Sequence, residues 1–355
     1  MANAKDSIEI SYYGDGRMSY AEYRGKIYTI PRVVPEEEKI GARNKFWMKH
    51  PDNDKRFLVK YAIEMEDLGE VLFYEFCRQG NLDIDVVPYQ MAEVKGKDGM
   101  ETACVCPSYI RENTAEEEHS AERIYGKYNK QAKIYSANPE REPNLDFTIH
   151  QYRKMLEDKY PGYQGIEEAL THITKMTILD YFTLQEDRHF GNFSFFVSPE
   201  DAKEKKITAV PVYDSGNIWG LSHPRDGNII HETKDALRNV PLLGIMTPTA
   251  AIKQANTGKM RVATPPKDEQ TMLTFEQELA EVIVLDDELA AFYNQVRGVN
   301  LSKVLDSVGD MLDERTKKSI MTFMNARKGR LDKSIEAAKA ALGMPDTTTD
   351  RGVEK

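Results

Sequence analysis

The segment from Leu184 to Phe196 reads LQEDRHFGNFSFF and gathers two acids, an Arg, a His and an Asn directly before an aromatic run. Within it, Asp187 and Asn192 form a D-x-x-x-x-N pattern, and an Asp-x-Gly sequence follows at Asp214. This order suits phosphoryl transfer from a nucleotide. One carboxylate can accept or orient the proton of an attacking hydroxyl, while an amide oxygen and a second carboxylate hold the magnesium ions that bridge the phosphates.

Two further polar side chains, Arg188 and His189, follow Asp187 directly. They either donate hydrogen bonds beside the phosphate oxygens or fix the loop itself. A polar loop with a helix cap would contain similar residue types. The correctly spaced Asn192 and the later Asp214 favour the kinase interpretation over this simpler one.

A nucleotide site also needs a cation for the phosphates. Lys60 is the candidate, because it directly follows the apolar residues FLV on a predicted central strand. A lysine in such a place needs a partner. The following helix, predicted over Met65 to Gln79, offers Glu70 and Glu75, and Glu70 is the first choice because Glu75 lies nearer the apolar stripe. The alternative for Lys60 is an edge position that faces solvent.

A loop over the phosphates is predicted at Gly41 to Lys45, which reads GARNK. Its backbone N–H groups, and the cations Arg43 or Lys45, could contact phosphate oxygens. The loop contains a single glycine, so this indication rests on position more than on pattern.

Four stretches of the chain resemble the HipA-like bacterial serine/threonine protein kinases, and they are most similar to the shorter CtkA-like branch. The stretches are LDYFTLQEDRHFGNFSFF, PVYDSG, RFLVKYA and GEVLFYEFCRQGN. The most specific part is D-R-H-x-x-N followed by a strand and D-x-G. Members of this family have a small β-rich lobe and a helical lobe, and they use ATP and magnesium to phosphorylate Ser or Thr hydroxyls.

The resemblance implies roles for the residues of the catalytic segment. Asp187 would be the catalytic base, with Arg188 and His189 beside it in the catalytic loop. Asn192 and Asp214 would be the magnesium ligands. These assignments agree with the chemistry argued from the residue types alone.

The resemblance also implies how ATP is bound. Lys60 would bind its phosphates, with Glu70 as the partner of this lysine. The segment that contains Cys106, Ser108 and Ile110 would be the hinge that meets adenine through backbone groups.

The toxin members of the family autophosphorylate a Ser in the phosphate-binding loop, but GARNKFWMKH contains no Ser or Thr. The sequence therefore does not favour self-inhibition of that kind, and autophosphorylation at another site stays open.

Two alternatives to a protein kinase stay open. The first alternative is a pseudokinase or nucleotide-gated binding module of a toxin–antitoxin-like system. The second is a small-molecule or lipid kinase, because phosphoinositide kinases share D-R-H-x-x-N.

The charge and composition of the chain limit the kinds of partner that it is expected to bind. The 355 residues carry a net charge of −10, which argues against a general nucleic-acid binder. No stretch approaches the roughly 20 apolar residues of a membrane span, and the first residues, MANAKDS, do not resemble a signal peptide. We expect a bacterial cytoplasmic protein, with secretion as an effector left open, that acts on a protein substrate with a Ser or Thr acceptor and contacts neither nucleic acid nor membrane. An antitoxin partner is a further open expectation.

The predicted elements place the chemistry on an α+β chain. Strands and turns around one helix fill the first hundred residues, including a hairpin over Lys45 to Ala62. A helix before Leu184 leads into the catalytic segment, and a hairpin of NFSFFV and ITAVPVY carries Asp214. A long loop is predicted over Leu221 to Gln270, and helices from Thr274 to about Leu342.

We therefore predict a bilobal, protein-kinase-like α+β fold. Residues 1–110 form a nucleotide-binding β-rich N-lobe with one helix. Residues 111–345 form a mainly helical C-lobe with the catalytic loop and the metal site, and residues 346–355 form a disordered tail.

Overall fold

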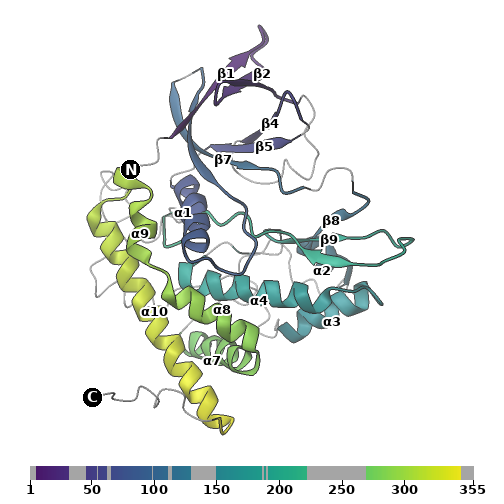
Figure 1. Cartoon of the computed structure of the whole chain (residues 1–355), viewed down its shortest axis with the longest axis vertical. Coiled ribbons are helices and arrows are strands. Elements are labelled where there is room, and N and C mark those ends of the chain that lie inside the picture. The colour runs from purple at the N-terminus through teal and green to yellow at the C-terminus, as the bar shows by residue number, and fades with distance from the viewer. Residues whose placement is uncertain are drawn as a thin grey trace, which may run out of the picture.

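The computed structural model describes residues 5–31, 45–53, 55–61, 65–97, 99–110, 114–128, 149–185, 188, 191–221 and 269–344. Within these ranges the chain has a mixed α+β architecture. A strand-rich part holds the first hundred residues and a helical part holds most of the rest, with helix α1 (Glu66–Gln79) between them (Figure 1). The predicted α+β class is therefore confirmed.

Seven strands close into a barrel in the order β1-β2-β3-β4-β5-β7-β6. In this order they span Asp6–Tyr12, Met18–Tyr23, Lys26–Thr29, Lys45–Lys49, Arg56–Tyr61, Met100–Pro107 and Gln90–Lys95. All neighbours are antiparallel except β1 and β6, which run parallel and close the barrel. The interior is filled by a small apolar cluster that includes Ile8, Met48 and Val59.

The predicted hairpin over Lys45 to Ala62 is observed as β4 and β5. The chain reverses at Pro51 to Asn53, where the N–H of His50 donates to the carbonyl of Lys55 at 2.8 Å. Turn-forming residues at this point thus set the register that brings Lys45 opposite Lys60.

Helix α1 packs beneath the barrel against β6, β7 and α9 (Leu301–Asp306). Its apolar stripe of Leu68, Leu72 and Phe76 is buried in a second, larger core that also contains the helical part. Helix α1 therefore contributes to the same core as the helices that follow.

Helix α4 (Ile166–Thr183) is buried along most of its length and leads to the predicted catalytic segment. It ends at Leu184, which is fully buried and has a left-handed backbone with φ of 51°. Because non-glycine residues avoid this conformation, the tertiary structure must hold the chain reversal after α4.

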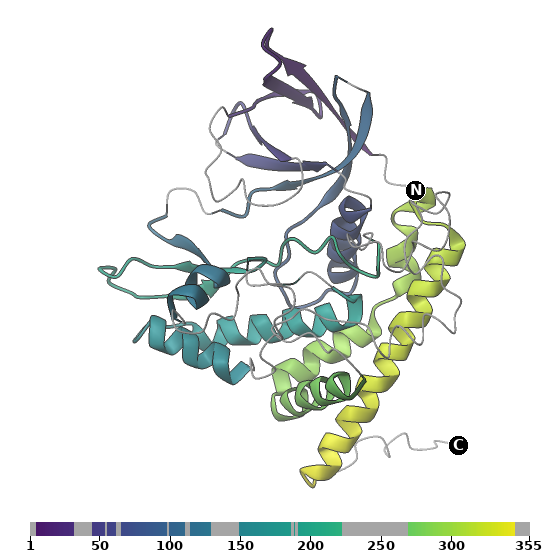
Figure 2. The ribbon, with the colours of Figure 1, turned by 180° about the vertical axis from the view of Figure 1, so that it is seen from behind.

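The other helices of the described residues are α2 (Ala121–Tyr128), α3 (Ile149–Lys159), α7 (Glu269–Leu285), α8 (Asp287–Gly298), α9 (Leu301–Asp306), the 3₁₀ turn η4 (Gly309–Met311) and α10 (Glu314–Ala341). Of these, α3, α8 and α10 pack against α4. The long helix α10 runs along one edge of the molecule, and the view from behind shows the same arrangement (Figure 2). The expected helical run from Thr274 to about Leu342 is thus confirmed, and no described helix is long and apolar enough to cross a membrane.

A second, three-stranded sheet has the order β10-β9-β8, with bounds Ile207–Ala209, Ser194–Val197 and Glu117–Ser120. The hairpin of β9 and β10 was predicted. Strand β8 lies in the charged run Glu116 to Glu122 and was not predicted. His119 of β8 pairs with Phe195 and approaches the hydroxyl of Tyr160 at 2.7 Å, so only part of this strand faces solvent.

Two predicted segments fall largely outside the described residues. These are the loop over Leu221 to Gln270, of which the structure describes only the first residue and the last two, and the tail 346–355. The domain boundary at residue 110 stays a prediction.

Candidate active site

Lys60 lies near the end of β5 and is only 6% exposed. Its cross-strand neighbours are Lys45 on β4 and Cys104 on β7, so these three side chains share one face of the barrel wall. The Lys60 ammonium lies 2.8 Å from Oε1 of Glu70 and 3.1 Å from Oδ1 of Asp214. Strand, helix and Asp-x-Gly segment therefore meet at this one cation.

Glu70 joins α1 to the Asp-x-Gly segment as well as to Lys60. Its second oxygen, Oε2, accepts a hydrogen bond from the backbone N–H of Ser215 at 2.8 Å. The other candidate partner, Glu75, instead accepts from Arg78 and Gln79. Of the two glutamates considered, it is Glu70 that contacts the lysine.

The aromatic ring of Tyr89 forms another wall of this site, since the Lys60 ammonium lies 4.9 Å from the ring centroid. Burial, and then the charge of Glu70, raise the pKa of the Tyr89 hydroxyl well above its usual value. The same two causes raise the pKa of the Cys104 thiol. Both side chains are therefore neutral near pH 7, and Glu70 and Asp214 supply the negative charge beside Lys60.

Asp214 is placed so that its carboxylate can meet a ligand. The side chain is 39% exposed, although it touches Lys60. Its backbone has a left-handed φ of 55°, and its carbonyl accepts from Nε2 of Gln185 at 3.2 Å. A strained backbone held by a buried neighbour is typical of functional positions.

Arg188 is 1% exposed and connects the two ends of the predicted metal site. One nitrogen, Nη1, donates to the carbonyls of Asn192 at 2.9 Å and Tyr213 at 2.7 Å. Nη2 donates to Oγ of Ser215 at 2.8 Å. Both predicted magnesium ligands, Asn192 and Asp214, thus lie on chain segments that the same guanidinium holds.

The partner of this guanidinium is Asp180 on α4, with Nε donating to Oδ2 at 3.0 Å and Nη2 to Oδ1 at 3.3 Å. Neither side chain is exposed. Burial raises the pKa of the Asp180 carboxyl and Arg188 opposes this shift. For Arg188, burial acts to lower the pKa, but the charge and hydrogen bonds of Asp180, together with the charges of Asp214 and Glu70, leave the pKa raised. These contacts favour the second of the two roles considered for Arg188, in which it fixes the loop.

The donor set at Asn192 and Asp214 suits magnesium bound together with phosphates. No group of three or more His, Cys, Asp or Glu that could hold a metal occurs among the residues the structure describes. Magnesium commonly takes one or two protein oxygen ligands and completes its shell with phosphate and water. One amide and one carboxylate therefore fit an ion that arrives with a nucleotide.

The predicted hinge begins in the last two residues of β7, Cys106 and Pro107, and its backbone groups are partly engaged in hydrogen bonds. The N–H of Ser108 donates to the Arg56 carbonyl at 2.8 Å, and the N–H of Ile110 donates to Oγ of Ser108 at 3.2 Å. Cys106 is buried opposite Leu58. An adenine that used either of these N–H groups would have to replace an intrachain bond.

Three predicted site residues lie outside the described part of the chain: Asp187, His189 and Arg43. Their roles stay predictions.

Sequence reasoning missed several residues of the site: Asp180, Tyr89, Gln185 and Ser215. Asp180 could have been found, because a carboxylate inside the apolar run ILDYF of a helix requires a buried cation as partner. The others depend on contacts between distant segments that have no local pattern.

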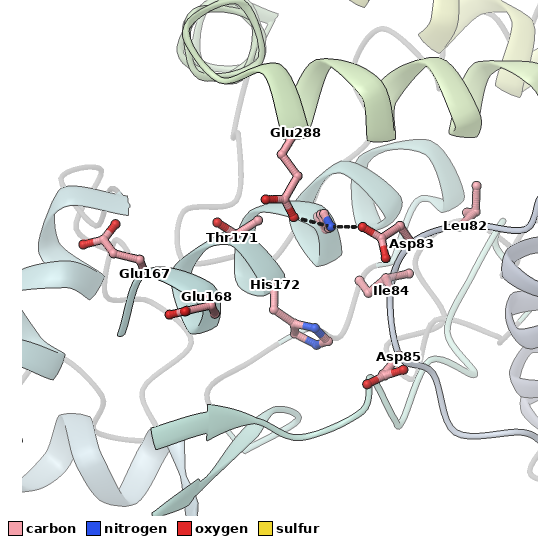
Figure 3. A pocket seen from close by; sticks show the side chains of 10 residues that line it. Leu82, Asp83, Ile84, Asp85, Glu167, Glu168, Thr171, His172 and Glu288 are labelled. Atoms are coloured by element: carbon pink, nitrogen blue, oxygen red, sulfur yellow. Dashed lines mark hydrogen bonds and ion pairs between the residues drawn. The ribbon is translucent and has the colours of Figure 1, made fainter. Parts of the chain in front are cut away.

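A separate pocket of about 560 Å³ lies between the chain after α1, the helix α4 and the start of α8 (Figure 3). Asp83 and Glu288 each contact Lys175 at 2.7 Å. Burial lowers the pKa of His172 in this pocket to about 4, so it is neutral near pH 7. The lining of this pocket has one cation, Lys175, against the carboxylates of Asp83, Asp85, Glu167, Glu168 and Glu288. This excess of acidic groups disfavours phosphate, so the Lys60 site is the better candidate for it.

Solved structures of other proteins are similar to this chain. The chain is similar to CtkA, a proinflammatory kinase of Helicobacter pylori, with a TM-score of 0.53 and 13% identity over 88% of this chain and 96% of that chain. It also matches HipA of Shewanella oneidensis MR-1, from a toxin–antitoxin complex with HipB and operator DNA, with a TM-score of 0.42 and 11% identity over 89% and 68% of the two chains. A TM-score of 0.42 is too low to support an argument.

No protein-family model matches the sequence, and neither does any curated protein. The likeness to CtkA shows a kinase-like α+β fold. It agrees with the resemblance found in the sequence motifs. At 13% identity it shows the fold and leaves activity to be argued from the site.

Proposed function

We propose that this chain is an ATP- and magnesium-dependent kinase, similar to HipA and CtkA, that transfers the γ-phosphate to Ser or Thr of a protein substrate. The observation that carries the proposal is the contact of one buried lysine, Lys60, with both Glu70 and Asp214. Kinases need a lysine held by a helix glutamate, beside the carboxylate that binds magnesium. Here all three groups are already assembled.

The proposed chemistry assigns one task to each group. Lys60 binds phosphate oxygens, and Glu70 holds the lysine in place. Asn192 and Asp214 hold magnesium, which when bound neutralises the charge that builds on the phosphates. Asp187 accepts or orients the proton of the attacking hydroxyl. Arg188 contributes by fixing the segments that carry Asn192 and Asp214.

The proposal includes a two-lobe arrangement with the boundary at residue 110, so that the nucleotide would lie between the barrel and the helices. Lys45, opposite Lys60, is placed to add positive charge near the phosphates. An antitoxin partner and a cytoplasmic location stay predictions.

Removal of the proposed metal ligand tests the nucleotide site directly. ATP should raise the melting temperature of the wild-type protein only when magnesium is present, because a ligand stabilises only the state that binds it. Asp214→Ala should abolish most of this shift. Asp201→Ala, at an exposed turn residue between β9 and β10, is the matched control and should keep it. An undiminished shift in Asp214→Ala would show that the metal site lies elsewhere.

A further inference from the structure

The backbone of α1 comes unusually close to the Asp-x-Gly segment at Gly69. A side-chain carbon placed on Gly69 would overlap the carbonyl oxygen of Gly216 and would lie 2.8 Å from its carbonyl carbon and 3.1 Å from its Cα. These neighbours are backbone atoms and cannot turn aside as a flexible side chain could. Any residue larger than glycine would therefore force α1 and the 214–216 segment apart.

This close approach coincides with the two-sided contact of the next residue, Glu70. One oxygen of its carboxylate accepts from Lys60 and the other from the N–H of Ser215, each at 2.8 Å. The Glu70 side chain is fully buried. Its reach to both groups depends on the separation between α1 and the Asp-x-Gly segment, and that separation is limited by Gly69.

The far end of α1 is anchored to the same stretch of chain. Phe76 packs edge-on against Trp219 with ring centroids 6.2 Å apart. Trp219 is in turn fixed by its backbone N–H, which donates to the Thr183 carbonyl at 2.7 Å. A push at Gly69 would therefore tilt the start of α1, where Glu70 lies, because the helix is held at Phe76.

We propose that Gly69 is a positioning residue of the nucleotide site: its missing side chain sets the distance at which Glu70 holds Lys60 and Ser215 together. Glycine lowers the stability of a helix interior relative to alanine. In α1 the close approach of Gly69 to Gly216 offsets this cost. The expected effect on turnover rests on the proposed kinase function. The expected effect on the pairing of Lys60 with Glu70 does not depend on that function.

The test compares Gly69→Ala with Gly329→Ala. Gly329 lies in α10 with open space around it, so alanine there should raise the melting temperature and change nothing else. Lys60 reactivity toward an amine-acylating reagent, read by peptide mass spectrometry, reports on its pairing without any nucleotide. In Gly69→Ala we expect Lys60 to react several-fold faster than in the wild type. It should approach the rate in Glu70→Gln, where the ion pair is removed by design.

Catalysis gives the second readout. A displacement of about 1 Å at a reacting site lowers turnover on the order of 10²-fold, so kcat per folded protein should fall in Gly69→Ala and stay at the wild-type value in Gly329→Ala. A purely structural glycine would lower the melting temperature and leave kcat unchanged. If the wild type does not turn over ATP, the proposed function fails, while the acylation rate of Lys60 still decides the role of Gly69.

A folded Gly69→Ala protein with wild-type acylation of Lys60 would overturn the proposal. If Gly69→Ala does not fold, hydrogen exchange of the wild-type protein decides instead. The Ser215 amide should then be protected as strongly as the amides in the middle of α1, because it donates to Glu70 beneath the helix. Fast exchange at Ser215 would contradict the proposed contact.

Discussion

Replacing Asp187 by Asn is expected to lower phosphate transfer by roughly 10²–10⁴-fold, which is the usual contribution of a general base. The substitution keeps the size of the side chain and most of its hydrogen bonds while it removes the group that accepts the proton. Affinity for ATP should change little, because Lys60, Asn192 and Asp214 are untouched. If Asp187 only caps a loop, Asn is an equally good cap, and activity should survive.

Turnover and nucleotide affinity must be measured on the same folded preparation, since only their difference separates a base from a cap. The matched control is Asp201→Asn, the same chemical change at an exposed turn residue, which should leave both quantities at the wild-type value. Wild-type turnover in Asp187→Asn would remove Asp187 from the proposed mechanism.

The second large effect is expected on stability. Arg188→Met should lower the free energy of unfolding by about 3–5 kcal/mol, because it leaves the Asp180 carboxylate buried without its cation. The same change removes the hydrogen bonds to the carbonyls of Asn192 and Tyr213. Urea unfolding at pH 7 measures this loss directly.

The pH dependence of this loss identifies its cause. Burial already raises the pKa of Asp180, and without Arg188 that shift is no longer opposed. A carboxyl whose pKa is raised in the folded state favours folding at low pH and loses that contribution as pH rises through the folded pKa. The deficit of Arg188→Met relative to the wild type should therefore shrink as pH falls from 8 to 5.

The reciprocal variant Asp180→Asn should show no such recovery, because an arginine does not lose its charge in this range. As a control, Glu9→Gln removes one partner of the exposed pair with Lys95, and its stability should match the wild type at every pH. A deficit in Arg188→Met that does not change with pH would rule out an unpaired Asp180 as its source.

Much of the fold could be predicted where local patterns decide it. The β4–β5 hairpin follows from the turn residues after His50, and α1 from the spacing of Leu68, Leu72 and Phe76. The closed barrel could not be predicted, because it depends on a parallel pairing of β1 with β6, which are far apart in sequence. Strand β8 was missed because its outward residues are charged and only its pairing with β9 reveals it.

The same distinction applies to the site. Lys60 could be identified from its apolar strand, but the choice between Glu70 and Glu75 depends on the phase of α1 against the barrel. Arg188 is buried because it pairs with Asp180. Asp180 belongs to the preceding helix and lies outside the D-R-H-x-x-N motif. Gly69 matters only through its distance to Gly216, which no local pattern contains.

The transfer of phosphate itself tests the central claim most directly. The purified protein is incubated with ATP labelled in the γ-phosphate, with and without magnesium, in the presence of a mixture of Ser- and Thr-containing proteins, and intact masses are then recorded. We predict label on protein and mass gains in multiples of one phosphate, dependent on magnesium and lost in Asp187→Asn. A wild-type protein that binds ATP with magnesium yet transfers no phosphate to any protein would contradict the assignment as a protein kinase.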